Sequence, residues 1–303
     1  MPHTIEYIID RISELNALHS KKLKKNIDNC DLEYFERAEV FLKKYESMLL
    51  AENKTLDFAI DCYLRMLADV NYETVQFLRN GSYSNSSFTG VNERIYRNPD
   101  IMTYYMHGLL LSQFLWIQHY KVFQFFIEII TDQRRQVKNY LEVGGGHGLF
   151  ISEAIRVIGK HACYDMVDIS KSSIELAKCM TGNNDVLYHQ TDIRDYNSPS
   201  QYDFITMGEV MEHVEDPAGL LRKTFSLLND GGSLFITTPT NAPAIDHIYL
   251  FNNAGEIRKI ISEAGFEIKD ELCVYSEDMP AAKAEKNKVS MMYAGVLKKT
   301  GKS

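Results

Sequence analysis

Hydrophobic positions in the first part of the chain recur at helical spacing. Ile5, Ile8 and Ile12 are separated by three or four residues, which places them on one face of an α-helix. The same rhythm continues to about residue 135. One polar stretch with glycines, RNGSYSNSSFTG at 79–90, interrupts it and predicts a loop, with a mobile flap as one possible role.

The longest apolar region lies within this helical part, at 101–130. Its length is that of a membrane span, but His107, Gln113, His119 and Lys121 interrupt it, and polar side chains at this density are too costly in lipid. The region therefore predicts one or two buried helices.

Near residue 138 the rhythm changes to short apolar runs that alternate with helical segments. This alternation predicts a parallel α/β sheet with helices on both faces. The last two runs have no helical pattern between them, which predicts an antiparallel hairpin at one edge. We expect a helical domain over 1–137 and an α/β domain over 138–303. The seven predicted strands are NYLEV, ACYDMVDI, DVLYHQTDI, YDFITM, GSLFITTP, EIKDELCVY and VSMMYAGVLKK.

Composition narrows the function classes. The 303 residues are 45% hydrophobic and 24% charged, as in a folded protein, with a formal net charge of −8. This charge argues against a nucleic-acid partner, because phosphate binding needs clustered Lys and Arg; a small-molecule substrate fits better. The five cysteines are scattered without a CxxC pair, and the N-terminus shows no secretory pattern. We expect a cytoplasmic protein without membrane attachment.

A glycine turn follows the first predicted strand, as Glu142-Val143-Gly144-Gly145-Gly146-His147-Gly148. Such a turn lets the backbone approach a ligand closely, and the following helix presents free N–H groups. The dinucleotide fingerprint GxGxxG does not fit, because Leu149 stands where its third glycine belongs.

The spacing ExGxGxG instead resembles the first motif of class I S-adenosylmethionine-dependent methyltransferases. The resemblance covers 138–303 and implies a Rossmann-like seven-stranded sheet preceded by a helical cap. By resemblance, Glu142 holds the ammonium end of S-adenosylmethionine, and Gly144, Gly146 and Gly148 pack against its amino-acid and ribose parts.

Later positions extend the resemblance. Acids follow the second and third predicted strands; each alone could be a helix N-cap, but together and in order they match the family pattern. The implied cofactor-binding residues are Asp168 and Ile169 at the ribose, Asp192 and Ile193 at the adenine, and Met207 at the floor of the site.

The stretch GEVMEHVEDP at 208–217 crowds four acids and a histidine after the fourth predicted strand. If the chain is helical there, Glu209, Glu212 and His213 share one face and form half of a divalent-metal site. With His247 after the fifth strand, the set resembles the metal site of small-RNA 2′-O-methyltransferases and of metal-dependent ubiquinone-pathway O-methyltransferases. We therefore expect these four residues to bind Mg, Mn, Fe or Zn, with Glu212 and His213 also catalytic.

The implied activity is methylation of a small molecule, at oxygen and with help from the metal. Three alternatives stay open. Glu212 and His213 could simply pair with each other or cap a helix. His213 could act as the base of a metal-free N- or C-methyltransferase. The chain could also bind the cofactor without catalysis.

The helical half is expected to form a lid over the substrate. Aromatic side chains suit an enclosed apolar pocket with a few polar handles. The alternatives for each candidate are packing in the helical core, or a dimer interface in a homodimer. The pocket candidates are Tyr83, Tyr96, Tyr104, Tyr105 and His107.

Overall fold

A computed structural model describes residues 4–28, 30–182 and 185–299. Its first part is helical, as the periodicity predicts, and the apolar region 101–130 forms two successive helices. The elements are α1 (Thr4–Leu15), α2 (Ala17–Ile27), α3 (Leu32–Ala51), α4 (Leu56–Asn80), α5 (Phe88–Val91), a π-helical turn η1 (Asn92–Tyr96), α6 (Pro99–Leu115) and α7 (Ile117–Gln133).

The second part alternates strands and helices. These elements are β1 (Asn139–Val143), α8 (Leu149–Ile158), β2 (Cys163–Asp168), α9 (Lys171–Thr181), β3 (Val186–Gln190), β4 (Tyr202–Gly208), the 3-10 turn η2 (Met211–His213), α10 (Pro217–Leu227), β5 (Leu228–Thr240), α11 (Ala254–Glu263), β6 (Phe266–Tyr275), α12 (Ala281–Lys286) and β7 (Met291–Lys299).

The seven strands form one sheet in the order β3-β2-β1-β4-β5-β7-β6. β1 to β5 run parallel, and β7 lies antiparallel between β5 and β6. The predicted seven-stranded α/β fold with preceding helices is confirmed, including the antiparallel end. One detail differs, because the short helix α12 separates β6 from β7 where the sequence pattern predicts none.

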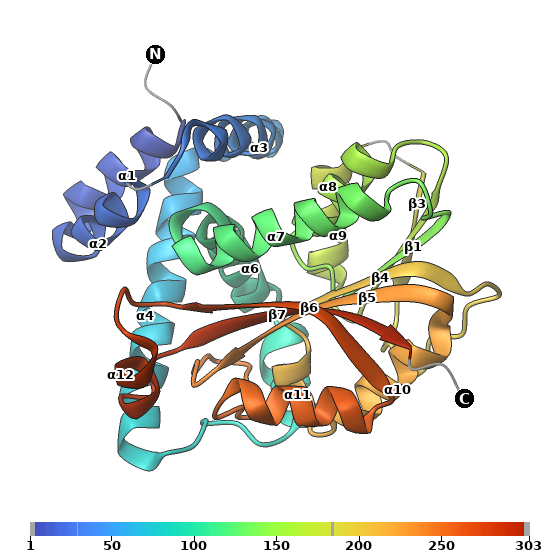
Figure 1. The fold of residues 1–303 in the computed structure, drawn as a ribbon. Helices are drawn as coiled ribbons and strands as arrows, with labels where there is room; N and C mark the ends of the chain where they lie inside the picture. The colour runs from blue at the N-terminus through green and yellow to red at the C-terminus, as the bar shows by residue number, and fades with distance from the viewer. Residues whose placement is uncertain (1–3, 29, 183–184, 300–303) are drawn as a thin grey trace.

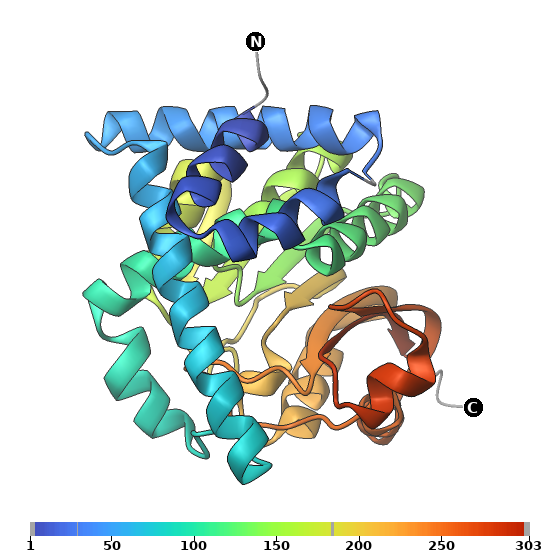
Figure 2. The ribbon, with the colours of Figure 1, turned by 90° about the vertical axis from the view of Figure 1, so that its left-hand side faces the viewer.

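The sheet is covered on both faces because side chains alternate along each strand. Tyr140 of β1 faces the cluster that contains α7, α8 and α9. Its neighbour Leu141 faces the other cluster, with α10 and α11. Figures 1 and 2 show α1 to α3 gathered at one end of the molecule, and the long α4 running away from them beside the sheet. None of the described helices is long and apolar enough to cross a membrane.

The last helix before the sheet also touches the sheet. Phe126 of α7 packs edge-on against Phe235 of β5 at 5.2 Å between ring centroids, and against Phe150 of α8 at 4.9 Å. The helical segment is therefore joined to the sheet through an aromatic core, so α6 and α7 have a fixed place above it. The division into domains at residue 138 remains a prediction.

Gly148 begins α8 in a left-handed conformation, with φ 74° and ψ 17°. A Cβ at this position would lie 2.9 Å from the Cα of Ala177 in α9, so glycine permits both the turn and the close packing of the two helices. Gly81 has nearly the same conformation, with φ 72° and ψ 9°, but a Cβ there would meet nothing within 4 Å.

These two glycines give a matched test. Gly81→Ala should lower the free energy of unfolding by about 1 kcal/mol, the cost of a left-handed L-residue. Gly148→Ala should cost at least about 1 kcal/mol more, because the added methyl group overpacks the α8–α9 contact. Urea unfolding of both variants measures the difference, and equal losses would contradict the packing role of Gly148.

Candidate active site

One cavity opens where the parallel strands end and lies beneath the segment from α5 to α7. Phe88, Tyr96, Met102, Tyr105 and Met106 form its cap side. Its floor comes from the turns after β1, β2, β4 and β5 and from residues 191–194 after β3. The carboxyl ends of parallel strands are the usual place for a ligand in such a sheet.

The glycine turn contributes backbone to this cavity. Gly144 and Gly146 line it, whereas Gly148 does not and contacts α9 instead. Gly144 has φ 65°, and a Cβ on it would lie 2.6 Å from Cγ2 of Val210. A side chain at this position would collide with the turn after β4, so the two turns meet only because position 144 is glycine.

Glu142 is the penultimate residue of β1 and is deeply buried, with 2% of its surface exposed. Its Oε2 accepts a hydrogen bond from Tyr140 Oη at 3.0 Å. Burial, with a smaller contribution from the nearby Asp168 charge, raises the pKa of Glu142 to about 8 against the opposing effect of the Tyr140 hydrogen bond. A cationic group in the cavity would lower this pKa and draw the carboxyl group into its ionised form.

Asp168 ends β2 and is fixed to the glycine turn. Its Oδ2 accepts from the N–H of Gly146 at 3.2 Å, and its Oδ1 accepts from the N–H of Ser170 at 2.8 Å. Burial raises the pKa of Asp168 to about 6, against the opposing effect of these hydrogen bonds. Asp168 and Ile169 both line the cavity.

Asp192 follows β3. Unlike Glu142 and Asp168, it forms an ion pair among the described residues, with Arg194. Two nitrogens of Arg194 approach its carboxylate at 3.0 and 2.6 Å. Burial alone would raise the pKa of Asp192, but the Arg194 hydrogen bonds outweigh it and hold this pKa below its usual value. Asp192 and Ile193 line the cavity, whereas Met207 lies in the core of the sheet and does not.

The α-helix expected directly after Met207 is wrong. β4 continues to Gly208, and Glu209 takes a left-handed conformation with φ 54°. Its N–H donates to the carbonyl of Thr237 at 3.0 Å and its Oε1 accepts from Thr237 Oγ1 at 2.8 Å. These bonds tie Glu209 to β5, so helical geometry begins only at η2.

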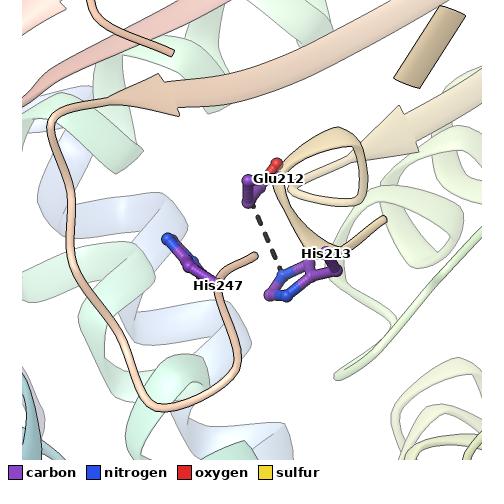
Figure 3. A group of neighbouring side chains, drawn as sticks. All are labelled: Glu212, His213 and His247. Atoms are coloured by element: carbon purple, nitrogen blue, oxygen red, sulfur yellow. Dashed lines mark ion pairs between the residues drawn. The ribbon is translucent and has the colours of Figure 1, made fainter. Parts of the chain in front are cut away.

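The structure brings three of the four proposed metal ligands together. Glu212, His213 and His247 each offer a ligand atom, and these atoms lie within 4.8 Å of one another. Figure 3 shows that the three side chains come from two separate segments. Glu212 and His213 belong to η2, and His247 to the loop after β5. Glu209 lines the same cavity but is bonded to Thr237 instead.

Hydrogen bonds set the tautomers of both histidines. Nδ1 of His213 lies 3.1 Å from the carbonyl of Asp246, and Nδ1 of His247 lies 2.6 Å from the carbonyl of Ala242. A carbonyl oxygen only accepts, so both Nδ1 atoms carry a hydrogen. Each neutral ring therefore keeps a lone pair on Nε2, the atom that can bind a metal or a proton.

The third member of the cluster has an unused oxygen. Glu212 is fully buried; its Oε2 accepts from Thr238 Oγ1 at 2.8 Å. Its Oε1 has no hydrogen-bond partner within the described part of the chain and lies 3.7 Å from His213 Nε2. Burial raises the pKa of Glu212 well above its usual value, and the charge of Glu209 adds to this. Such an atom is costly unless something positive or a donor meets it.

A tyrosine–aspartate network at this site was not assigned from the sequence. Asp246, 4% exposed, accepts from Tyr105 Oη at 3.0 Å and from Tyr96 Oη at 3.4 Å. Tyr96 Oη also lies 3.1 Å from His213 Nδ1. Asp246 stands beside His247 in the sequence, but its partners lie about 140 and 150 residues away, which no local pattern reveals.

Two more cap residues hold the same loop. Tyr83 Oη accepts from the N–H of Ala242 at 3.0 Å, and Asn85 Nδ2 donates to the carbonyl of Ile245 at 2.8 Å. The loop of residues 242–248, called here the His247 loop, is thus tied to the cap by Tyr83, Asn85, Tyr96 and Tyr105.

The other two pocket candidates lie elsewhere. Tyr104 Oη donates to Asp69 at 2.6 Å beside a second depression, formed by α4, α6 and the segment between them. His107 is buried in the helical core, where its Nδ1 is bonded to Tyr45 Oη. Tyr96 and Tyr105 line the main cavity, and so do three polar residues not proposed from sequence, Gln113, His119 and His147.

Comparison with known proteins places this site in a family. A sequence model described as a methyltransferase domain matches residues 117–271. The chain is similar to a ubiquinone biosynthesis O-methyltransferase from Marinobacter nauticus, at 36% identity over 35% of this chain and 46% of the relative. It is also similar to a malonyl-[acyl-carrier protein] O-methyltransferase from Ilyobacter polytropus, at 29% identity over 37% and 42%. The chain spans about half the length of the curated relatives it matches.

Solved structures give more distant likenesses. The StiE O-methyltransferase segment shares 16% identity and a TM-score of 0.48 over 73% of this chain and 84% of that one. The N-methyltransferase NodS from Bradyrhizobium japonicum, in complex with S-adenosylhomocysteine, shares 17% identity and a TM-score of 0.48 over 69% and 97%.

The raised pKa of Glu142 predicts how the stability of the ligand-free protein depends on pH. The folded protein keeps a proton on Glu142 up to about pH 8, whereas an unfolded glutamate loses it near pH 4.3. Between these values the folded state binds the extra proton, so its stability falls as pH rises. Glu142→Gln, which stays neutral, should lose less stability between pH 6.5 and 8.5.

Urea unfolding at pH 6.5, 7.5 and 8.5 measures this dependence. Glu175, an exposed residue of α9, provides the control, and Glu175→Gln should follow the parent protein. A Glu142→Gln profile parallel to that of the parent would contradict the buried, protonated state of Glu142.

Proposed function

Because the chain belongs to the methyltransferase-domain family, we propose that it transfers a methyl group from S-adenosylmethionine to a hydroxyl oxygen of a small molecule. The observation that carries this proposal is the sharing of one cavity by the acids at the ends of β1, β2 and β3 and by the histidines of the metal-type cluster. A cofactor held by the first group would place its reactive end near the second.

The residues present fit S-adenosylmethionine. Gly144 and Gly146 bring the backbone of the turn to the cavity wall, where a Cβ would crowd Val210 and Met106. Glu142 and Asp168 are buried acids without a cationic partner among the described residues, and an ammonium and ribose hydroxyls would meet this need. Asp192 and Ile193 stand at the adenine end of the proposed site, as the family resemblance implies.

Binding of S-adenosylhomocysteine tests the cofactor proposal directly. Asp168→Asn should weaken binding roughly 10- to 100-fold in isothermal titration calorimetry, since a hydrogen bond to a charged group is worth about 1.5–3 kcal/mol. Asp195→Asn, an exposed change after β3, should leave affinity unchanged. A parent protein that does not bind S-adenosylhomocysteine would refute the proposed function.

The cluster of Glu212, His213 and His247 supports the proposal that oxygen is the methyl acceptor. Two imidazole Nε2 atoms and one carboxylate oxygen form a donor set suited to a divalent transition metal with open positions. The unpartnered Glu212 Oε1 supports a cation here, because a cation would satisfy it. A metal ion bound there would supply Lewis-acid polarisation of a substrate hydroxyl and so lower its pKa.

The chain's own residues orient this chemistry. The carbonyls of Asp246 and Ala242 hold both imidazoles with Nε2 free, and Thr238 fixes the Glu212 carboxylate. The apolar cap side of the cavity, with Met102, Met106 and Tyr105, excludes water from the reacting groups. The two matched relatives are both named as O-methyltransferases, which also supports oxygen as the acceptor atom.

A metal-free reaction is the competing proposal, and one feature favours it. Nε2 of His213 lacks a hydrogen in the neutral ring and could itself take the proton of an acceptor. In that case His247 and Glu212 would not need to share an ion. Metal binding separates the two proposals.

We expect the parent protein to bind one Zn²⁺ or Mn²⁺ ion per chain in calorimetric titration. His247→Ala should weaken this binding at least about tenfold because it removes one of three ligands, while leaving affinity for S-adenosylhomocysteine unchanged. His161→Ala, an exposed histidine between α8 and β2, is the control. Equal metal affinity in His247→Ala and the parent protein would exclude the cluster as the metal site and favour His213 as a simple base.

A further inference from the structure

The proposed cofactor carries an α-carboxylate, and this anion needs a partner in a cavity rich in acids. Among the described residues that line the cavity, Arg194 is the one Lys or Arg side chain. Its guanidinium donates to both oxygens of Asp192 and lies over the Phe88 ring, 5.0 Å from the ring centroid. Arg194 therefore belongs to the β3 side of the cavity and is already neutralised there.

The strand order indicates where the carboxylate would lie. With the adenine near Asp192 after β3 and the ribose near Asp168 after β2, the amino-acid end must extend past the glycine turn after β1. At this point α6 and α7 cover the turn, since a Cβ on Gly146 would lie 3.1 Å from Cε of Met106. Gln113, His119 and His147 line the cavity in the same region.

His147 presents an N–H group that has no partner. Its Nδ1 accepts from the N–H of Leu149 at 3.3 Å, so the hydrogen of the neutral ring lies on Nε2. Nε2 forms no hydrogen bond within the described residues. Burial lowers the pKa of His147 to about 4, which makes the neutral donor the form present at physiological pH when no anion is bound.

His119 presents a second such group from the cap. It is 9% exposed, and its Nδ1 lies 3.2 Å from Gln113 Nε2 and 3.1 Å from Ser112 Oγ. When Gln113 donates to Nδ1, the hydrogen of the neutral ring lies on Nε2. A neutral ring that donated from Nδ1 to Ser112 Oγ, whose own hydrogen goes to the carbonyl of Leu109, would have no hydrogen on Nε2. Gln113 is therefore the residue that selects the donor form of His119. Burial lowers the pKa of His119 to about 3, with a further contribution from His147. A bound carboxylate would raise it.

Trp116 holds the His119 ring in place, with ring centroids 5.0 Å apart, and its own Nε1 donates to Tyr63 Oη at 2.8 Å in the helical core. The donor is thus fixed by the cap rather than by the sheet. Resting on the proposed function, we propose that His119 and His147 together bind the α-carboxylate of S-adenosylmethionine through their Nε2–H groups, with Gln113 positioning His119.

A pair of ligands that differ by one carboxylate tests this assignment. S-adenosylhomocysteine contains the carboxylate; its decarboxylated analogue keeps the adenosine, the thioether and the amine. The parent protein should bind S-adenosylhomocysteine roughly 10- to 100-fold more tightly than the analogue, as expected for two hydrogen bonds to a charged group. His119→Phe and His147→Ala should each lower this preference at least about threefold by weakening S-adenosylhomocysteine alone, with affinity for the analogue unchanged.

Calorimetric titration of the parent protein and each variant with both ligands measures this preference. His161→Phe, the same substitution at an exposed histidine, should keep the full preference. If His119→Phe does not fold, His147→Ala decides, since its ring lies in the turn and not in the helical core. Variants that keep the parent preference, or that weaken both ligands equally, overturn the carboxylate site while leaving the methyltransferase proposal intact. A parent protein that binds neither ligand overturns both proposals.

Discussion

Burial of acidic side chains at the ends of parallel strands is the constraint on which the site depends. Glu142, Asp168, Glu209 and Glu212 all end or follow a strand and all lie in a low-dielectric environment. Burial raises the pKa of each, which measures how unfavourable the charged forms are without a positive partner. A positive group bound in the cavity would lower these pKa values and stabilise the charged forms.

The backbone partners of three histidines in this cavity determine which ring nitrogen carries the hydrogen. Backbone carbonyls hold His213 and His247 as Nδ1–H tautomers, so both direct lone pairs from Nε2. The backbone N–H of Leu149 holds His147 in the opposite tautomer, which directs a hydrogen from Nε2. Nε2 is thus an acceptor in the cluster of Glu212, His213 and His247 and a donor at the glycine turn, and the difference follows from the backbone group that meets Nδ1.

Much of the fold could be predicted from the sequence because its signals are local. The period-three-to-four pattern of Ile5, Ile8 and Ile12 and the alternating runs after residue 138 depend only on neighbouring residues. Glu142 and Gly144 could be singled out for the same reason, because they lie within the short spacing ExGxGxG.

The features of the cavity that the sequence did not predict depend on distant partners. Glu209 lies in the left-handed region because Thr237, 28 residues later, binds both its N–H and its carboxylate; the local pattern GEVMEHV indicates a helix instead. Tyr104 and Tyr105 are adjacent and chemically identical, yet one lines the cavity and the other binds Asp69 outside it. The helical period separates them, and only the packing of α6 on α4 decides which faces inward. The sequence did not indicate that His119 and Gln113 line the cavity. A polar residue in an apolar helix gives the same sequence pattern whether it faces the protein core or a ligand.

The ties between the cap and the His247 loop have a consequence for how this chain can assemble and diversify. Among the described residues, each side-chain hydrogen bond from the cap to that loop joins residues more than 130 positions apart, so these bonds form only when both parts of the chain have folded. Without the cap, the loop would keep its bond from Ile248 to the carbonyl of Glu212 and its internal bond from His247 to Ala242. Exchange of the helical half for that of another protein would therefore remove the outer partners of Ala242, Ile245 and Asp246, and the replacement would have to supply groups that fit the same loop.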